Sequence, residues 1–542
     1  AKNPHEGQRI RSITHAKGMQ KKEELNMGKY VCGIDIGTTG VKVMIFGLDG
    51  TVMSSAYTEY PCTFPRSGWV EQDGEMTWTK TCETSRRAIE ESGLDPKEIV
   101  AIGLSTQRCT ITPIDKDGNA LCTSISWQDA RSFEEVEEIK QIIGEEEFYK
   151  ITGMPVGTLL PVTEIMWLKK NQPELYERAD LFVLDQERIL HKLGVEGYYE
   201  DWSNGSMYGL MDINKFEWDL ELTKKLGINP KKLPKLVPSG KILGEVPPSV
   251  SYLTGFAEGT LLVSGGGDQQ CAGIGAGAIK SGVIEVAMGT SGVTLGYMDK
   301  PNMDPTMEMP CSAHTIAGKW ESEGLQNAAA ASYKWFRNEF AYQENLVAQE
   351  KGMSVYDVIN EKIEQVDPGC NGLICIPYLA GSAAPHWDPF ARGTFIGFTL
   401  GHTREDMARA IMEGVTYEAK EIIEKMIANG MEVNEILLNG GGAKGPVWCQ
   451  IQADMYGKTC TTLDIEEATT LGAAILAALG AGLFETVEEA VDRMLRKKEV
   501  YNPNMKNHEL YNRYFQIYKD AYKALSDANI YERLVKLALE NK

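Results

Sequence analysis

The sequence lacks any Cys-x-x-Cys pair and any close spacing of cysteine and histidine that would indicate a zinc site. Its 11 cysteines are scattered, and several lie in apolar runs, such as Cys32, Cys271 and Cys375. We therefore expect reduced cysteines in the protein core, as in a cytosolic protein, and neither a disulfide framework nor a structural metal.

Long apolar runs and excess positive charge are also missing. No apolar run approaches the ~20 residues of a membrane span, and residues 1–28 lack the apolar centre of a signal peptide. The 55 Lys and Arg residues against 76 Asp and Glu residues give a formal net charge of -21, which argues against binding to nucleic acid or to an anionic membrane. We expect a cytoplasmic protein without either partner, in which residues 1–28 are disordered or an extension and Met27 is a candidate native start.

The length of 542 residues exceeds what one hydrophobic core holds, so we expect at least two large domains. Strand-like runs alternate with helical patterns through most of the chain, which is typical of the α/β class. Thr403 and Asp406 have the spacing of a capping box and predict the start of a long helix. The expected strands cover residues 99–105, 181–184, 261–264 and 436–438, and the expected helices cover residues 132–143, 161–171 and 403–428.

One motif occurs twice: a strand, a tight turn of glycine and hydroxyl residues, and a second strand. The first copy is CGIDIGTTGVKVMIF at residues 32–46, and the second is VIEVAMGTSGVTL at residues 283–295. Such a turn directs backbone N–H groups and hydroxyls into one small concavity, which binds phosphate with few cations. One copy would be an ordinary hairpin signal, but two copies predict a phosphate site and an internal duplication.

Two acidic residues accompany these turns. Asp35 is flanked by apolar residues in the first strand. An unpaired buried carboxylate is costly, so a metal or a network of phosphate and water is its natural partner. Asp268 follows three glycines between the two copies, and we expect it on a glycine-rich bend, placed to act on whatever receives the phosphate. The combination predicts an ATP-dependent phosphotransferase.

Two further segments are candidates for ligand contacts. Residues 438–446 read LNGGGAKGP, which predicts a strand, a glycine loop and a helix that begins at Pro446. The backbone of three glycines can lie against a flat ring or a phosphate, although a plain connector is the alternative. Arg108 and Trp127 follow strand ends, where open α/β sheets bind ligands. The alternative there is a buried Trp127 and an ion pair between Arg108 and Asp129.

Together these segments resemble the FGGY carbohydrate kinase family over nearly the whole chain, from Lys29 to about Tyr501. The similar segments are DIGTTG at 35–40, WVEQD at 69–73, GDQQ at 267–270, GTSG at 289–292, PHWDPFARG at 385–393, the glycine loop at 440–442 and the family's C-terminal signature over 393–413. The resemblance implies an α/β fold of two actin-like (ribonuclease-H-like) domains with ATP and sugar in the interdomain cleft. We expect a sugar-site domain over residues 29–280, an ATP-site domain over 281–500 and a helical tail over 501–542 that packs back on the body.

The resemblance also implies roles for single residues. Asp268 is similar to the family's catalytic base, and Asp35 is similar to its magnesium-associated acid, with Asp268 beside the same metal. The implied phosphate contacts are Thr38, Thr39, Gly289 and Thr290, and the implied adenosine loop is Gly441, Gly442 and Ala443. The implied sugar contacts are Arg108, Cys109, Trp127, Asp268 and Gln269, and the implied cofactors are ATP and Mg²⁺.

The expected substrate is a small sugar or polyol. The sequence leaves open whether the protein forms a homo-oligomer. Some motif residues are similar to those of glycerol kinase, but Cys109 stands where that enzyme has a glutamate, and Leu159 where it has a tyrosine. Residues 127–131 and 201–206 are closer to the xylulokinase-like pentulose kinases, although these have Met-His at Arg108 and Cys109. We expect a pentulose as the substrate, with glycerol or another polyol as the alternative. An actin-like ATPase that acts as a chaperone or a sensor is the alternative of another class.

Overall fold

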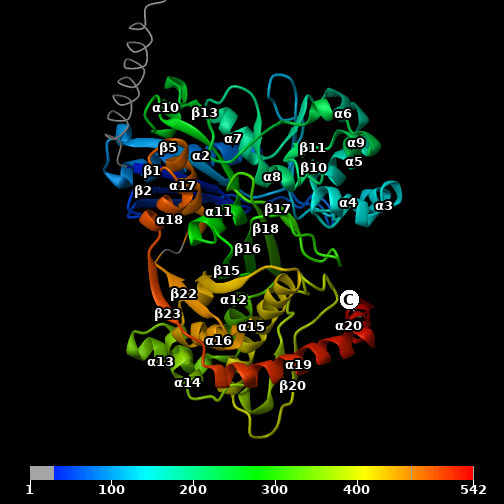
Figure 1. The fold of residues 1–542 in the computed structure, drawn as a ribbon, viewed down its shortest axis with the longest axis vertical. Coiled ribbons are helices and arrows are strands. Elements are labelled where there is room, and N and C mark those ends of the chain that lie inside the picture. The colour runs from blue at the N-terminus through cyan, green and yellow to red at the C-terminus, as the bar shows by residue number, and fades with distance from the viewer. Residues whose placement is uncertain (1–29, 465–466, 541–542) are drawn as a thin grey trace, which may run out of the picture.

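Two mixed β-sheets form the centres of two lobes in the computed structural model, which describes residues 30–464 and 467–540 (Figure 1). The expectation for residues 1–28 lies outside the described residues. The first sheet has the order β13-β14-β5-β1-β2-β3, with β1 (Tyr30–Ile36), β2 (Gly40–Gly47), β3 (Val52–Glu59), β5 (Ile99–Thr106), β13 (Ile242–Glu245) and β14 (Leu261–Gly267). The second has the order β17-β18-β16-β15-β21-β22-β23, with β15 (Gly282–Met288), β16 (Gly292–Met298), β17 (Cys311–Ala313), β18 (Trp320–Gln326), β21 (Val433–Asn439), β22 (Thr459–Leu463) and β23 (Lys497–Tyr501).

The two sheets repeat one topology. In the first, β2 pairs antiparallel with both β1 and β3, while β5 pairs parallel with β1 and with β14. In the second, β16 pairs antiparallel with β15 and β18, while β21 pairs parallel with β15 and β22. An antiparallel edge strand then follows on each, β13 on β14 and β23 on β22. This correspondence confirms the internal duplication that the two hairpin motifs predicted.

Helices cover both sheets. On the first sheet, α2 (Gly74–Ser92) packs against β2 and β3, and α17 (Ala468–Gly480) packs against β1 and β5. On the second sheet, α15 (Arg404–Ala428) packs against β16 and β18, and α16 (Pro446–Tyr456) packs against β22. Further helices are α7 (Asp185–Leu193), α10 (Pro248–Thr254), α11 (Asp268–Ala276), α12 (Ala330–Phe340), α13 (Tyr342–Lys351), α14 (Val355–Ile363) and α18 (Val487–Met494).

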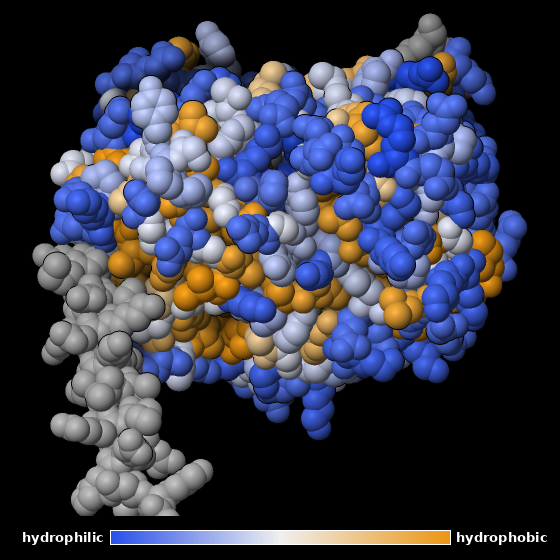
Figure 2. All heavy atoms as spheres, turned by 90° about the horizontal axis from the view of Figure 1, so that it is seen from above, coloured by the Kyte–Doolittle hydropathy of each residue, from blue (hydrophilic) through white to orange (hydrophobic). Residues whose placement is uncertain are grey.

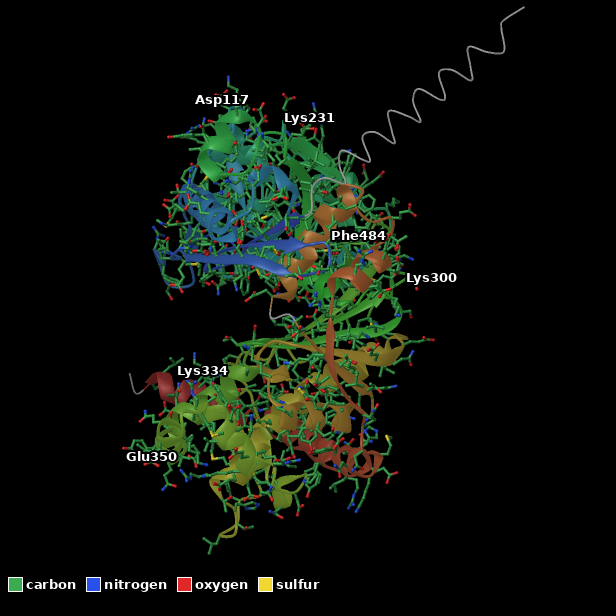
Figure 3. The ribbon with its side chains drawn as sticks, turned by 90° about the vertical axis from the view of Figure 1, so that its left-hand side faces the viewer. Asp117, Lys231, Lys300, Lys334, Glu350 and Phe484 are labelled. Carbon is green, nitrogen blue, oxygen red and sulfur yellow. The ribbon has the colours of Figure 1, made fainter. Side chains whose placement is uncertain are left out.

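Helix α17 returns the C-terminal half of the chain to the first sheet. Glycines without side chains allow the approach, because a Cβ at Gly33 would lie 2.1 Å from the carbonyl oxygen of Thr470, and a Cβ at Gly103 would lie 2.0 Å from that of Ala473. Figure 3 shows the result, with Phe484 in the same lobe as Asp117 and Lys231, whereas Lys334 and Glu350 lie in the other lobe. Residues 468–494 therefore belong to the C-terminal half of the sequence but lie in the first lobe.

A third group of elements, inserted into the first lobe, has its own apolar core around Phe148, Ile165 and Tyr208. Its helices and strands are α3 (Phe133–Ile142), α4 (Glu145–Thr152), α5 (Pro161–Asn171), α6 (Pro173–Arg178), α8 (Trp202–Ser206), α9 (Leu220–Lys225), β6 (Thr112–Ile114), β8 (Leu181–Val183), β9 (Tyr199–Asp201), β10 (Met211–Asp212), β11 (Glu217–Trp218) and β12 (Lys235–Val237). The remaining short strands are β4 (Glu71–Gln72), β7 (Ser124–Ile125), β19 (Ile374–Ile376) and β20 (Thr394–Ile396).

Local sequence signals set several element ends. Thr403 and Asp406 form the predicted capping box at the start of α15. The expected tail helix consists of two helices, α19 (Met505–Asp527) and α20 (Ile530–Glu540). They are separated at Asn529, whose φ of 54° departs from helical geometry. Aromatic residues of α19 pack on the ring of Tyr417 in α15, which confirms that the tail packs back on the body.

The cysteines Cys32, Cys271 and Cys375 are buried, as the sequence predicted, and all 11 cysteines are free thiols. Within the described ranges, no helix has the length and apolar character needed to cross a membrane. Figure 2 shows that hydrophilic residues cover most of one face, with hydrophobic residues in patches between them.

Candidate active site

Asp268 lies where β14 runs directly into α11, of which it is the first residue. The glycine-rich bend expected before it is instead the end of a strand, because β14 continues through Gly267. The glycines there serve packing: a Cβ at Gly265 would lie 1.6 Å from the carbonyl oxygen of Leu104, and one at Gly267 would lie 2.7 Å from Cδ of Arg108. The run of glycines thus lets Arg108 lie beside Asp268.

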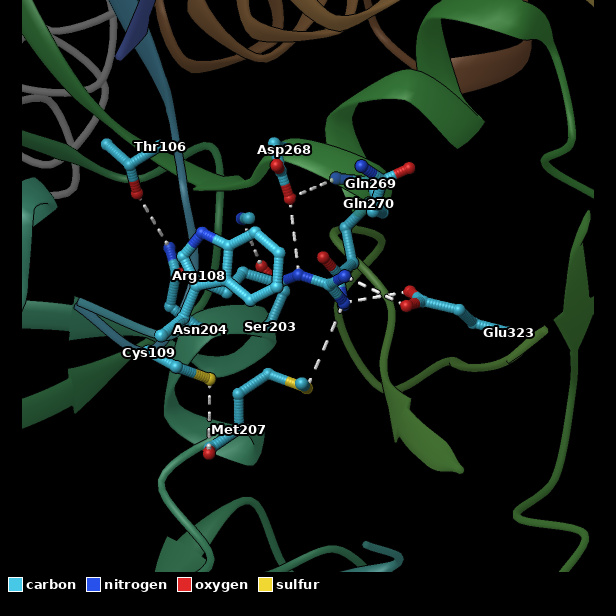
Figure 4. A network of polar contacts seen from close by, with 12 residues as sticks. Thr106, Arg108, Cys109, Ser203, Asn204, Met207, Asp268, Gln269, Gln270 and Glu323 are labelled. Carbon is cyan, nitrogen blue, oxygen red and sulfur yellow. Dashed lines mark hydrogen bonds and ion pairs between the residues drawn. The ribbon is translucent and has the colours of Figure 1, made fainter. Parts of the chain in front are cut away.

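Arg108 is held by two carboxylates (Figure 4). Its Nε lies 3.2 Å from Oδ1 of Asp268, and its two terminal nitrogens donate to Glu323 at 2.8 and 2.9 Å. The backbone N–H of Gln269 also donates to Oδ1 of Asp268, at 2.8 Å. Burial raises the pKa of Asp268 above its ordinary value, and the charge of Arg108 counteracts that rise. The carboxylate is therefore fixed in place and more basic than a solvated one.

The alternative placement of Arg108 and Trp127 is wrong. Asp129 pairs with Arg131, at 2.8 Å, and Arg108 pairs with Asp268 and Glu323 instead. Trp127 is not buried, since 38% of it is exposed, and its Nε1 donates to Oγ1 of Thr38 at 2.9 Å. The indole is therefore held against the first hairpin turn with a face open to a ligand.

One cavity of about 260 Å³ collects the predicted sugar contacts. Arg108, Cys109, Trp127, Asp268 and Gln269 all line it, together with Thr38 of the first hairpin. The second lobe closes the cavity with Ser291, Val293, Glu323 and Leu325, so the cavity lies between the two lobes. Its size suits a small ligand, since it falls below the roughly 300–1,000 Å³ of pockets for drug-sized molecules.

Cys109 and Leu159 give part of this cavity an apolar wall. Burial raises the pKa of the Cys109 thiol, so the sulfur stays protonated. Its Sγ lies 3.7 Å from the carbonyl oxygen of Met207, to which the thiol donates. Neither side chain can therefore accept a strong hydrogen bond from a ligand hydroxyl.

Asp35 is the second-last residue of β1, close to the first turn, and it accepts a hydrogen bond from Ser105 at 2.8 Å. Burial, and then the charge of Asp268, raise the pKa of Asp35 to about 7, against the opposing effects of Ser105 and Lys42. Lys42, on β2, forms an ion pair with Glu467, the residue that precedes α17. The two carboxylates are thus close enough to repel each other, and a cation would relieve that repulsion.

The two predicted turns have the expected form. Ile36 pairs with Val41 across the first, and Met288 pairs with Gly292 across the second. Thr39, Thr290 and Ser291 are exposed at the turns, while Thr38 and Gly289 are partly buried. A Cβ at Gly289 would meet nothing closer than 3.5 Å, so space for a ligand adjoins this backbone.

The glycine loop follows β21 and leads into α16, which begins at Pro446 as predicted. The three residues expected to contact adenosine, Gly441, Gly442 and Ala443, differ in their surroundings. Gly441 lines a cavity of about 410 Å³ and also one of about 920 Å³. Ala443 lines only the larger of these two, and Gly442 is buried, where a Cβ would lie 2.7 Å from Cβ of Met288.

The cavity of about 410 Å³ is lined by aromatic rings that sequence reasoning missed, Tyr333, Tyr356 and Trp448. The ring of Tyr333 lies 5.5 Å from that of Tyr356 and 5.7 Å from that of Trp448, between centroids. Glu323 was missed as well, because it lies on a strand without any motif. Lys42 could have been identified from the sequence as a candidate site residue, since it stands seven residues after Asp35 on the opposite strand of a phosphate-type hairpin.

Comparison with known proteins agrees with this geometry. Residues 30–275 match the N-terminal domain of the FGGY family of carbohydrate kinases, and residues 285–481 match its C-terminal domain. A xylulose kinase of Bacillus subtilis is 31% identical over 502 residues, which are 92% of this chain and 98% of that protein. A gluconokinase of the same species is 32% identical over 468 residues, 86% of this chain and 90% of that protein.

The solved structure of ligand-bound xylulose kinase from Lactobacillus acidophilus superimposes with a TM-score of 0.84 at 26% identity, covering 92% of this chain and 98% of that one. The two lobes are thus two actin-like domains, and both halves of the family pattern are present in one chain. The protein belongs to the FGGY family of carbohydrate kinases.

Proposed function

We propose that the protein transfers the γ-phosphoryl group of ATP to a hydroxyl of a pentulose. The observation that carries this proposal is the cavity of about 260 Å³ between the lobes, where Asp268, Arg108 and Trp127 meet an apolar wall of Cys109 and Leu159. The sugar would stack on the exposed indole of Trp127, and its hydroxyls would pair with Arg108 and Gln269.

In this proposal Asp268 is the catalytic base. The substrate hydroxyl attacks the γ-phosphorus in line, its proton passes to the carboxylate of Asp268, and ADP leaves. The ion pair with Arg108 and the hydrogen bond from the N–H of Gln269 keep this carboxylate oriented. The raised pKa of Asp268 makes it a better proton acceptor than a solvated carboxylate.

The two turns would bind the phosphates. Backbone N–H groups and hydroxyls of Thr38, Thr39, Gly289 and Thr290 are the groups available there, with Lys42 beside Asp35 as a nearby cation. The adenine ring would occupy the cavity of about 410 Å³ among Tyr333, Tyr356 and Trp448, with Gly441 at its edge. Aromatic faces suit a flat heterocycle.

The donor set fits magnesium. Among residues 30–464 and 467–540, no group of three or more His, Cys, Asp or Glu side chains could hold a metal by itself. Mg²⁺ is commonly bound by one or two carboxylates together with substrate phosphates, and Asp35 and Asp268 would supply those carboxylates. The ion would neutralise charge on the transferred phosphoryl group.

Steady-state kinetics test the proposal, with ADP release measured for D-xylulose, L-ribulose, glycerol and erythritol. A pentulose should give the highest kcat/KM, because a buried site discriminates strongly against ligands that leave polar groups unpaired. The highest kcat/KM with glycerol would overturn the pentulose assignment. ATP consumption that no sugar or polyol stimulates would instead favour an actin-like ATPase that acts as a chaperone or sensor. The cytoplasmic location and the oligomeric state stay predictions.

A further inference from the structure

The charges that face the cavity of about 260 Å³ are few. Among the described residues that line it, Arg108 is the one cation, and Asp268 and Glu323 are the two carboxylates. The thiol of Cys109 is neutral, since burial raises its pKa. A small ligand there meets one positive charge that already faces two negative ones.

Glu323 uses the part of Arg108 that a ligand carboxylate would need. Both oxygens of Glu323 accept hydrogen bonds from the two terminal nitrogens of the guanidinium, at 2.9 and 2.8 Å. This paired geometry is the one in which arginine recognises any carboxylate. The remaining Nε faces Asp268, so the guanidinium keeps single N–H groups for sugar hydroxyls but has no free edge that could bind a ligand carboxylate with two parallel hydrogen bonds.

The ion pair is only slightly hydrated, because 13% of the Arg108 side chain and 12% of the Glu323 side chain are exposed. Burial alone would lower the pKa of Arg108, but Glu323 and then Asp268 more than compensate and raise it. Glu323 reaches Arg108 from β18 of the second lobe, whereas Arg108 follows β5 of the first. The pair therefore forms only where the two lobes enclose the ligand space.

We infer that Glu323 is a specificity-determining residue that restricts this site to uncharged sugars and polyols and excludes aldonates. An aldonate would have to displace Glu323 from Arg108 or lie next to two carboxylates, and either arrangement costs binding free energy. A neutral ketose needs only to donate hydroxyls to the outer lone pairs of the same carboxylates. The inference rests on the proposed function and decides between substrate classes that the relatives divide between them, xylulose and gluconate.

A purely structural role for Glu323, as a link between the lobes, is the competing explanation. It predicts that loss of the carboxylate weakens every ligand alike. The charge explanation predicts opposite effects on neutral and acidic ligands, because removal of one negative charge leaves the guanidinium available. The ratio of the two affinities therefore separates the explanations.

The test compares Glu323→Gln with the parent protein and with Glu321→Gln. Glu321 lies two residues earlier on β18, is buried, and does not line the cavity. Burial raises the pKa of Glu321 well above its ordinary value, and its carboxyl group accepts a hydrogen bond from Ser312, which does not line the cavity either. Binding of D-gluconate and of xylitol is measured by calorimetry without ATP, and kcat/KM is measured for D-gluconate and D-xylulose with ATP. Thermal unfolding checks that each variant is folded.

The parent should bind xylitol and bind D-gluconate about 100-fold more weakly or not measurably, as expected for a ligand that meets unpaired like charge. Glu323→Gln should shift the ratio toward D-gluconate by about tenfold or more, the size that one unit charge produces at short range in a partly buried site. Glu321→Gln should keep the parent ratio. An unchanged ratio in a folded Glu323→Gln protein, or a parent that prefers D-gluconate, would overturn the inference.

The binding measurements test the charge inference, and the kinetic measurements test the proposed function, so either one can be contradicted without the other. A parent that binds xylitol but phosphorylates none of the sugars would contradict the proposed function and leave the charge inference supported by the binding ratio. A Glu323→Gln protein that does not fold is replaced by Glu323→Asp, which keeps the charge and should keep the preference for neutral ligands. Loss of that preference in a folded Glu323→Asp protein would count against the inference.

Discussion

At the scale of single residues, the active site is defined by carboxylates whose surroundings differ. Asp268 has Arg108 as a direct partner, whereas among the described residues the hydroxyl of Ser105 is the one hydrogen-bond donor to the side chain of Asp35. The same burial therefore affects them differently, and Asp35 has a pKa of about 7. We assign proton transfer to Asp268 and cation binding to Asp35 on this difference.

The change Asp268→Asn should preserve the fold and ATP binding but reduce turnover by roughly 10²–10⁴, the usual contribution of a positioned base. The amide keeps the shape of the side chain and cannot accept the proton of the substrate hydroxyl. Steady-state kcat with D-xylulose measures the effect, and Asn327→Asp, at an exposed position outside the sugar cavity, serves as a control. Turnover within a factor of a few of the parent would show that another group is the base.

The raised pKa of Asp35 predicts a pH dependence of stability. In the protein without metal, Asp35 stays protonated up to about pH 7, whereas in the unfolded chain it ionises near its ordinary, lower pKa. Its contribution to stability is therefore complete below the unfolded pKa and is lost as pH rises toward 7. With EDTA present, Asp35→Asn should unfold at a higher temperature than the parent at pH 8, and the difference should shrink toward pH 4.

Added Mg²⁺ supplies the control for that experiment. If Asp35 holds the cation together with ATP, then MgATP should stabilise the parent at pH 8 and should stabilise Asp35→Asn much less. Equal stabilisation of both proteins would place the metal elsewhere. A parent and a variant with the same melting temperature at every pH would contradict the raised pKa.

At the scale of elements, glycines have two separate uses in this chain. In the glycine loop Gly441 faces open space, since the nearest atom to a Cβ there would be the carbonyl oxygen of Met288 at 3.6 Å. Between helices, glycines close a contact: a Cβ at Gly472 of α17 would lie 1.8 Å from the carbonyl oxygen of Cys271 in α11, and one at Gly275 of α11 would lie 1.8 Å from that of Ala468. Only the first kind is available to a ligand.

The change Gly441→Val should raise the KM for ATP far more than the KM for the sugar. The added side chain would fit the backbone but occupy the space beside Tyr356 and Trp448 that we assign to the nucleotide. Both KM values are measured by varying one substrate at saturation of the other. An unchanged KM for ATP would show that the loop is only a connector.

The change Gly472→Ala should destabilise the protein, although alanine has the higher helix propensity. The methyl group would overlap backbone of α11, and overpacking of this kind costs about 1–3 kcal/mol or more. Thermal unfolding measures the effect, with Gly401→Ala as the control, because a Cβ there would meet nothing closer than 3.6 Å. A higher melting temperature for Gly472→Ala would mean that α11 and α17 can separate without cost.

At the scale of the whole molecule, the two lobes contribute different parts of the proposed active site. The described residues that line the cavity we assign to the adenine ring all belong to the second lobe, whereas Asp268 follows a strand of the first sheet. Ion pairs between Arg108 and Glu323 and between Lys42 and Glu467 connect parts of the chain that are far apart in sequence. Phosphoryl transfer needs both lobes around one water-free space.

We therefore expect the lobes to close further when both ligands bind. D-Xylulose with a non-hydrolysable ATP analogue should reduce the radius of gyration, measured by small-angle X-ray scattering, more than either ligand alone, because only the pair bridges the lobes. An unchanged radius of gyration with both ligands bound would mean that the active site is already assembled in the free protein.

Much of the fold could be predicted from the sequence. The paired hairpins, the capping box at Thr403 and the helix that begins at Pro446 depend on neighbouring residues, so local sequence determines them. The predicted sugar contacts also lie around one cavity. Turns, caps and apolar alternation are short-range effects, and one chain shows them without any partner.

The tertiary structure alone decided which distant residues complete the site. Glu323 has no motif around it, yet β18 places it against Arg108, 215 residues away in sequence. The return of α17 to the first sheet and the aromatic cavity of Tyr333, Tyr356 and Trp448 were equally invisible. Such contacts depend on how the two sheets and their covering helices pack. Two residues that come into contact only after their elements have folded and packed have no fixed spacing in the sequence, so the sequence by itself does not reveal them.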